Sequence, residues 1–212
     1  MTNVPRIRVV VLGSSRVGKS AVTVRYLTKR YIGEYSSTTD LLYRHNVSFD
    51  SVNIEVEILD TCKCKITGCL YDHLRWGEAF VVVYSVCDEA SFREAQLLLE
   101  TLAKLKLPSY YTTLLLGNKR DLEHSKKVCV DAGQELSLRY GCQFYEVSAA
   151  ESYAGVSLAF QSLLREARSV QLLRAMPIRR KLGVNSVSKV LGTIFGQNKS
   201  RDRGKKRPSL SI

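Results

Sequence analysis

Gly13-Ser14-Ser15-Arg16-Val17-Gly18-Lys19-Ser20 is the stretch that decides the fold. Two glycines five positions apart precede a lysine and a serine. Small glycines let backbone N–H groups curl around phosphate oxygens, the lysine reaches the outer phosphates, and the serine hydroxyl can ligate magnesium. The apolar run at residues 7–12 predicts a buried strand before the motif, and residues 21–29 predict a helix after it. This context indicates a P-loop that binds a nucleoside phosphate.

The rest of the sequence repeats the strand-then-helix pattern. Short apolar runs, typical of strands buried on both faces, lie at residues 52–59, 80–86, 113–116 and 144–147. Apolar side chains at helical spacing occupy residues 91–107, which Pro108 ends, and residues 131–140 and 155–173. The alternation predicts an α/β fold, a mostly parallel sheet with helices on both faces.

One strand is expected to run against the others. Residues 43–49 and 53–59 are joined across Asp50 and Ser51, a connection too short for a crossover. They must therefore pair as a hairpin, which gives the sheet a single antiparallel edge strand.

A second motif, Asn118-Lys119-Arg120-Asp121, directly follows the predicted strand at residues 113–116. The Asp121 carboxylate can accept hydrogen bonds from both N1–H and the amino group of guanine, a pair of donors that adenine lacks. Taken alone, the tetrapeptide is also an ordinary polar loop. Its position at the carboxyl end of a strand, about one hundred residues after the P-loop, favours a guanine site.

Two further strand ends carry candidate ligand groups. Asp60 follows residues 53–59, where an aspartate can hold magnesium through water or simply cap a turn. Ser148 and Ala149 follow residues 144–147, and a backbone N–H there could donate to the guanine carbonyl or belong to a plain turn.

Charge is unevenly divided along the 212 residues, whose formal net charge is +12. Residues 1–164 hold 19 Lys/Arg and 18 Asp/Glu, whereas residues 165–212 hold 13 and 2. An apolar content of 45% is enough to build a full core. The nearly neutral body therefore predicts one globular domain over residues 1–176, followed by a basic, flexible extension over residues 177–212.

With these motifs in hand, residues 6–173 closely resemble the Ras superfamily. Residues 27–35 (LTKRYIGEY) and 74–80 (LRWGEAF) resemble the branch that contains the Ras-related estrogen-regulated growth inhibitor and its Ras-like relatives. The resemblance implies a P-loop NTPase fold with a six-stranded sheet and five helices. It also implies a small GTPase that acts as a GDP/GTP signalling switch with Mg²⁺.

Carried over by position, the resemblance places Tyr31 against the guanine ring and lets Thr38 ligate magnesium when the γ phosphate is present. Tyr35 and Tyr43 would flank the effector loop, although a core or cross-strand role is the alternative for Tyr31 and Tyr43. Ala150 stands where the family has a lysine, which would loosen the lid over the base. The implied base-binding residues are Tyr31, Asn118, Lys119, Asp121, Ser148 and Ala149, and the implied metal ligands are Ser20, Thr38 and, through water, Asp60.

The second switch departs from the family pattern. Lys63 replaces the glycine whose N–H meets the γ phosphate, and Cys64 replaces the glutamine that orients the attacking water. Arg16 is a bulky cation where small residues are usual, so we expect slow hydrolysis and poor response to GTPase-activating proteins. No confident catalytic residue remains. The phosphate-binding residues would be Ser15, Arg16, Val17, Gly18, Lys19, Ser20 and Lys63, with Lys63 or Arg16 on the γ phosphate as a bolder alternative.

The six cysteines are expected to be reduced thiols, because no secretory signal precedes them. Cys62, Cys64 and Cys69 match zinc spacing poorly. No cysteine follows Cys142, so we expect no prenyl anchor. The sequence thus predicts a cytoplasmic protein.

The basic extension offers three interpretations. Apolar residues at helical spacing between residues 184 and 195 and the basic cluster at residues 199–207 would suit an anionic membrane surface. The same cluster would suit nuclear import or nucleic acid. A solvated tail without a partner is the third interpretation, and Ser209 could be a kinase site.

Partner proteins are expected at residues 35–43 and 61–76 of a monomer. The main alternative to a slow GTPase is a pseudo-GTPase that serves as an interaction module or scaffold without turning over GTP. A P-loop kinase of small metabolites is disfavoured by residues 118–121, which suit guanine rather than a phosphoryl acceptor.

Overall fold

The computed structural model describes residues 5–35, 39–49, 52–62, 68–105 and 111–175. The chain divides into two units, Met1–Ala175 and Met176–Ile212. Every described residue lies in the first unit, so the predicted extension, with its proposed membrane and nuclear contacts, lies outside the described residues.

A six-stranded sheet forms the centre of the first unit, in the order β2-β3-β1-β4-β5-β6. The strands are β1 (Arg6–Leu12), β2 (Leu41–Phe49), β3 (Val52–Asp60), β4 (Ala79–Ser85), β5 (Thr112–Asn118) and β6 (Gln143–Glu146). All neighbouring pairs are parallel except β2 and β3, whose antiparallel register places Tyr43 opposite Ile58. The predicted parallel sheet with one antiparallel edge strand is confirmed.

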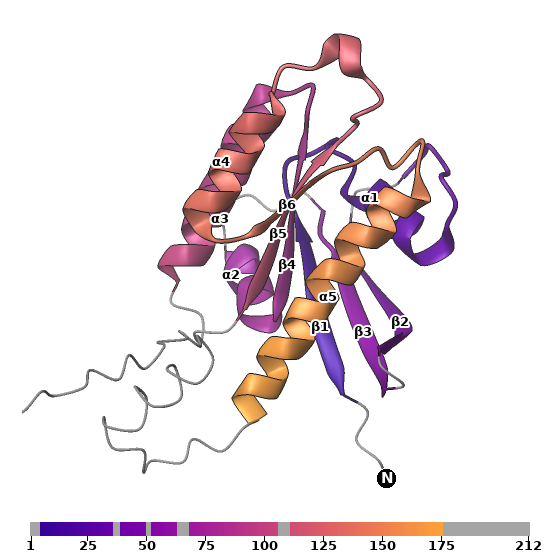
Figure 1. Ribbon diagram of the computed structural model, residues 1–212, viewed down its shortest axis with the longest axis vertical. Coiled ribbons are helices and arrows are strands. Elements are labelled where there is room, and N and C mark those ends of the chain that lie inside the picture. Colours follow the sequence, from indigo (N-terminus) through magenta and orange to yellow (C-terminus); the bar gives the residue numbers. More distant parts are fainter. Residues whose placement is uncertain (1–4, 36–38, 50–51, 63–67, 106–110, 176–212) are drawn as a thin grey trace, which may run out of the picture. The chain divides into compact units, whose positions relative to one another are not determined.

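Five α-helices cover the sheet: α1 (Lys19–Thr28), α2 (Gly68–Trp76), α3 (Glu89–Lys104), α4 (Val130–Tyr140) and α5 (Tyr153–Ala175). A short 3-10 helix, η1 (Glu123–Ser125), follows β5. Helices α1 and α5 pack together over one face, while α2, α3 and α4 lie over the other (Figure 1). None of the helices in the described part of the chain is long and apolar enough to cross a membrane.

Alternate residues of each central strand enter two separate cores. In β1, Val9 and Val11 join the core beneath α1 and α5, whereas Val10 and Leu12 join the core beneath α2, α3 and α4. Each of these side chains is at most 1% exposed. Burial on both faces explains why the strands appear in the sequence as continuous apolar runs.

The predicted helices begin one or two residues before the expected starts, and α5 ends two residues later than predicted, whereas α1 and α3 end earlier. Lys29 lies outside α1, because it adopts a left-handed conformation (φ 63°) that ends the helix, and its N–H donates to the Arg25 carbonyl. Helix α3 ends at Lys104 rather than at residue 107. Helix α2 had no counterpart in the pattern of apolar runs and was implied only by the family resemblance.

Candidate nucleotide-binding site

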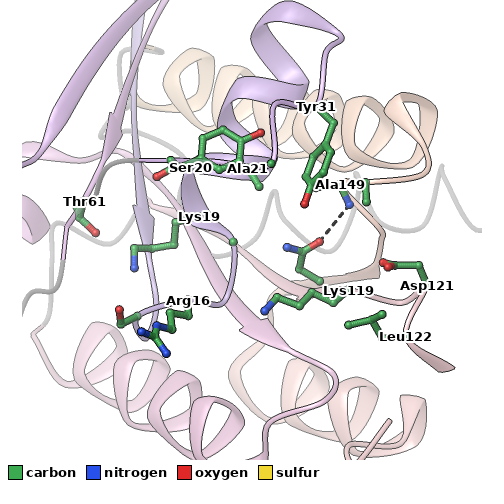
Figure 2. Close-up of a pocket in the computed structure, with 16 residues that line it drawn as sticks. Arg16, Lys19, Ser20, Ala21, Tyr31, Thr61, Lys119, Asp121, Leu122 and Ala149 are labelled. Atoms are coloured by element: carbon green, nitrogen blue, oxygen red, sulfur yellow. Dashed lines mark hydrogen bonds between the residues drawn. The ribbon is translucent and has the colours of Figure 1, made fainter. Parts of the chain in front are cut away.

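A pocket of about 510 Å³ opens at the carboxyl ends of β1 and β5. Figure 2 shows Arg16 and Lys19 at one end and Asp121, Leu122 and Ala149 at the other. The lining combines both sequence motifs with parts of the loops after α1, β3 and β6: Ser15, Arg16, Gly18, Lys19, Ser20, Ala21, Tyr31, Gly33, Tyr35, Thr61, Asn118, Lys119, Asp121, Leu122, Ala149 and Ala150.

The two glycines of the P-loop are sterically required. Gly13 has φ 139°, and a Cβ there would lie 2.1 Å from the carbonyl oxygen of Val83 on β4. Gly18 has φ 98°, and its Cβ would lie 2.3 Å from Nδ2 of Asn118. The loop is thus pressed against β4 and β5, and no side chain fits at either position.

The Lys19 side chain folds back onto the P-loop and bonds to its backbone. Its Nζ donates to the carbonyl oxygens of Gly13 at 2.8 Å and Ser14 at 2.9 Å, and the residue is only 8% exposed. On the outer side, the Ser14 hydroxyl donates to the carboxylate of Glu94 on α3. The lysine charge is therefore held inside the loop, where a phosphate would lie.

Arg16 adopts a left-handed conformation (φ 64°). This conformation costs a non-glycine residue about 1–2 kcal/mol, so the loop imposes it. Its side chain lines the pocket near Lys19 (Figure 2). The Val17 side chain, by contrast, is 1% exposed and belongs to the core, so only its backbone is available for phosphate.

Asp60 and Ser20 form the part of the site that suits a cation. The Ser20 hydroxyl hydrogen-bonds to Asp60, whereas Oδ1 of Asp60 is buried and has no hydrogen-bond partner among the described residues. Burial raises the pKa of Asp60, although Ser20 and Lys19 oppose that shift. A buried carboxylate oxygen beside a hydroxyl is a donor set that fits Mg²⁺. The third predicted ligand, Thr38, lies outside the described residues, as do Lys63 and Cys64.

Asn118 joins the two ends of the pocket. Its Nδ2 donates to the carbonyl of Val17 at 2.9 Å, and its Oδ1 accepts from the N–H of Ala149 at 3.2 Å. The second of these is the dashed line in Figure 2. At 2% exposure, its amide connects the P-loop to the loop after β6. Asn118 also lines the pocket, so its predicted contact with the base stays a prediction.

Three of the other residues predicted to bind the base line the pocket: Lys119, with φ 68°, Asp121 and Ala149. Ser148 is buried and is not part of the lining, and its hydroxyl accepts from the N–H of Glu151.

The tyrosines of the segment after α1 have distinct surroundings. Tyr31 is 47% exposed and lines the pocket, with its ring centroid 6.3 Å from that of Tyr35. The Tyr35 hydroxyl accepts from the N–H of Ile32 at 3.1 Å, which bends the segment back on itself. Tyr43 lies on β2 and packs against the core beneath α1 and α5, which is the alternative that the sequence left open for it.

A contact that the sequence did not suggest connects the start of β2 with α2. His73 Nε2 lies 2.9 Å from Oδ2 of Asp40, and the N–H of Cys62 donates to Oδ1 of the same carboxylate at 2.7 Å. Burial alone would raise the pKa of Asp40, but the hydrogen bonds from Cys62 and the neighbouring His73 outweigh it and hold that pKa below its usual value. The two segments expected to contact partners are therefore tied together.

No role was predicted for Arg25 from the sequence. Its side chain donates to carbonyl oxygens on both sides of the base end of the pocket, at Lys29 and Ala150. An arginine in the last turn of a helix is common, and backbone acceptors leave no trace in sequence, so no pattern could have found it.

The cysteines are not arranged as a metal site in the described part of the chain. Within the residues that the structure describes, no group of three or more His, Cys, Asp and Glu side chains is placed to hold a metal ion. Cys62 and Cys69 form no disulfide within those residues, and Cys64 lies outside the described part of the chain.

Comparison with known proteins identifies this arrangement. Residues 8–169 match the model of the Ras family. The chain is 38% identical over 180 residues to the human Ras-related and estrogen-regulated growth inhibitor, covering 85% of this chain and 90% of that protein. It is 35% identical over 200 residues to the bovine growth inhibitor-like protein, with coverage of 91% and 97%, and 37% identical over 182 residues to Ras-like protein family member 11B of Xenopus tropicalis, with coverage of 82% and 73%. The chain therefore belongs to the Ras family of small GTP-binding proteins.

Proposed function

We propose that this protein is a magnesium-dependent GDP/GTP signalling switch whose intrinsic hydrolysis of GTP is slow. The observation that carries the proposal is a single pocket with the P-loop at one end and Asp121 at the other, joined by the amide of Asn118. Because Asn118 fixes both loops, the phosphate end and the base end are held in one geometry.

Selection of guanine would come from two groups at the base end. The Asp121 carboxylate can accept from N1–H and the 2-amino group of guanine. The Ala149 N–H, which donates to Asn118 here, would share its proton with the 6-oxo group of the base in a three-centre bond. IDP lacks only the 2-amino group, so it tests the contact with Asp121. 2-Aminopurine riboside diphosphate lacks the 6-oxo group and, with it, N1–H, so a change in its relative affinity that IDP does not share reports on the Ala149 contact.

Magnesium would be held by the hydroxyl of Ser20, by Asp60 through water and by Thr38. When bound, it neutralises charge on the outer phosphates. The buried Oδ1 of Asp60 supports this assignment, since a cation or its water would satisfy that oxygen. Lys19 would leave the carbonyl oxygens of its own loop to meet the phosphates.

Slow hydrolysis is expected because Lys63 and Cys64 replace the glycine that meets the γ phosphate and the glutamine that orients the attacking water. A thiol is only a weak donor and a weak acceptor, so it cannot orient the attacking water as a glutamine amide does. Arg16 adds a bulky cation to the P-loop, in the space that an arginine finger from a partner would need. The lifetime of the GTP state would then depend on binding and exchange more than on turnover.

Single-turnover hydrolysis of GTP by the full chain tests the proposal. We expect a slow rate that rises at least tenfold when Lys63→Gly and Cys64→Gln are combined. Cys129→Gln, at an exposed thiol before α4, is the control and should leave the rate unchanged. Hydrolysis as fast as that of ordinary Ras proteins, or no rise in the double variant, would contradict slow turnover. Absence of saturable GDP and GTP binding would favour the scaffold alternative instead.

Partner proteins would be recognised through residues 35–43 and 61–76. The described part of this surface includes the start of the edge strand β2, where Leu41 and Leu42 are 40% and 49% exposed. Asp40 and His73 link its two halves, so a partner that binds one half is coupled to the other. Binding assays against chains loaded with GDP or a non-hydrolysable GTP analogue would reveal partners that distinguish the two states.

A further inference from the structure

We infer that Arg25 is a positioning residue that sets guanine selectivity, by fixing the two backbone segments on either side of the base. The inference rests on the proposed function, because it concerns the base end of the same pocket. Arg25, on α1, contacts the backbone of Ala150, the residue that stands where the family has a lysine.

The guanidinium of Arg25 spans two distant segments. Its Nη1 donates to the carbonyl of Lys29 at 3.0 Å, and its Nη2 donates to the carbonyl of Ala150, 125 residues further along the chain, at 3.2 Å. Tyr31 follows Lys29 by two residues, and Ala149 directly precedes Ala150. The guanidinium of Arg25 therefore connects the segment that leads to Tyr31 with the loop that carries the Ala149 N–H.

The loop after β6 is fixed from its other side by different contacts. The Ala149 N–H donates to Asn118, and Arg120 donates its N–H to the carbonyl of Val147 at 3.1 Å. Within the loop, the N–H of Ser152 donates to the carbonyl of Ser148 at 3.1 Å. These bonds tie the loop to β5 and to itself. Arg25 ties it to α1, across the exposed residue Ala150.

A second contact supports the same connection. The ammonium of Lys29 lies 5.6 Å from the centroid of the Tyr153 ring, at the start of α5. Lys29 also ends α1 in a left-handed conformation, so its carbonyl is turned toward the Arg25 side chain. The guanidinium thus holds the end of α1 to the loop after β6, and the cation–π contact holds it to the start of α5.

The chemistry of the contact requires arginine. Both acceptors are backbone carbonyls. Nε of Arg25 is buried and has no hydrogen-bond partner in the part of the chain that the structure describes, so the two terminal nitrogens make the contacts. A guanidinium presents these donors in a fixed plane, whereas the single ammonium of lysine cannot reproduce that fork. Hydrogen bonds from a charged donor are also stronger than neutral ones.

Equilibrium competition for fluorescent N-methylanthraniloyl-GDP bound to the full chain tests the inference. The competitors are GDP, IDP and 2-aminopurine riboside diphosphate. For Arg25→Ala, the preference for GDP over the 2-aminopurine nucleotide should fall about tenfold, the effect of losing one charge-assisted hydrogen bond. The preference for GDP over IDP should not change, because that ratio depends on Asp121. Arg25→Lys should behave like Arg25→Ala, and it serves as the test if the alanine variant does not fold.

Arg165→Ala is the matched control, since it removes the same charge from an exposed position on α5, and all three affinities should stay as they are. Equal weakening of the three competitors by both Arg25 variants would show that charge or fold stability alone is at work, and would overturn the inference. Unchanged ratios would overturn it as well. If the unsubstituted chain shows no saturable GDP binding, the proposed function fails, and this inference fails with it.

Discussion

Asn118→Ala should lower the free energy of unfolding by about 3 kcal/mol even without nucleotide. The substitution removes the bonds to Val17 and Ala149, and it leaves a carbonyl and an N–H without their partners at a site where Asn118 is 2% exposed. Each bond contributes roughly 0.5–1.5 kcal/mol, and each group left buried without a partner costs roughly 1–3 kcal/mol. The total is a large fraction of the 5–15 kcal/mol that is typical of a domain.

Urea unfolding of the nucleotide-free chain measures this loss. With a slope of about 2 kcal/mol per molar, 3 kcal/mol moves the midpoint down by about 1.5 M. Asn46→Ala, at an exposed position on β2, is the control and should change stability by less than about 0.5 kcal/mol. Repeating the titration with GDP should show a smaller stabilisation of the variant, because the two ends of the pocket are no longer held together.

A shift of the Asn118→Ala midpoint no larger than that of Asn46→Ala would refute the reasoning. It would mean that the P-loop and the loop after β6 keep their positions without the amide. Asn118 would then not be what holds the two ends of the pocket together.

Three further outcomes follow from the same structure. Gly13→Ala should destabilise the chain by more than about 2 kcal/mol in urea unfolding, because its Cβ would meet the Val83 carbonyl, whereas Gly141→Ala, with nothing within 4 Å, should cost only the roughly 1–2 kcal/mol of a left-handed residue. Burial raises the pKa of Tyr26 from 10.0 to about 12, so the neutral phenol stabilises the folded state below pH 10, and this contribution, about 2–3 kcal/mol, is lost as the pH rises toward 12. Tyr26→Phe should therefore show a smaller loss of stability over that interval, and an unchanged pH profile would contradict the assignment. Asp60→Asn should remove the acceleration of GDP release that chelating magnesium causes in the unsubstituted chain; persistence of that acceleration in a stopped-flow assay would exclude Asp60 from the metal site.

Sequence patterns were sufficient for the sheet and for the two ends of the pocket, because both depend on local features. A continuous apolar run is evident in any buried parallel strand, and Gly13 and Gly18 are required by close contacts that no other residue tolerates. Helix α2 was not predicted from the apolar pattern, because its buried side chains, Leu70 and Leu74, lie in a short segment whose other residues show no clear helical spacing of apolar side chains. Their spacing of four, followed by Gly77, was the signal available.

The connections within the site were beyond the reach of the sequence. The bonds of the Asn118 amide to Val17 and Ala149 were not predicted, because only the folded chain brings these groups together. The role of Arg25 depends on its contacts with backbone carbonyls, and since every residue has a carbonyl, no sequence pattern marks these contacts. The roles of Thr38, Lys63 and Cys64 remain predictions, since these residues lie outside the described part of the chain.

The amide of Asn118 also has a consequence for how the protein is made. The carbonyl that it supports, at Val17, is synthesised 101 residues earlier. At translation rates of about 5–20 residues per second, roughly 5–20 s pass between the synthesis of the P-loop and the synthesis of Asn118. The loop after β6, which the same amide holds, is made later still. Nucleotide is therefore expected to act on a nearly complete chain, late in folding, and nascent chains stalled before β5 should not retain GDP.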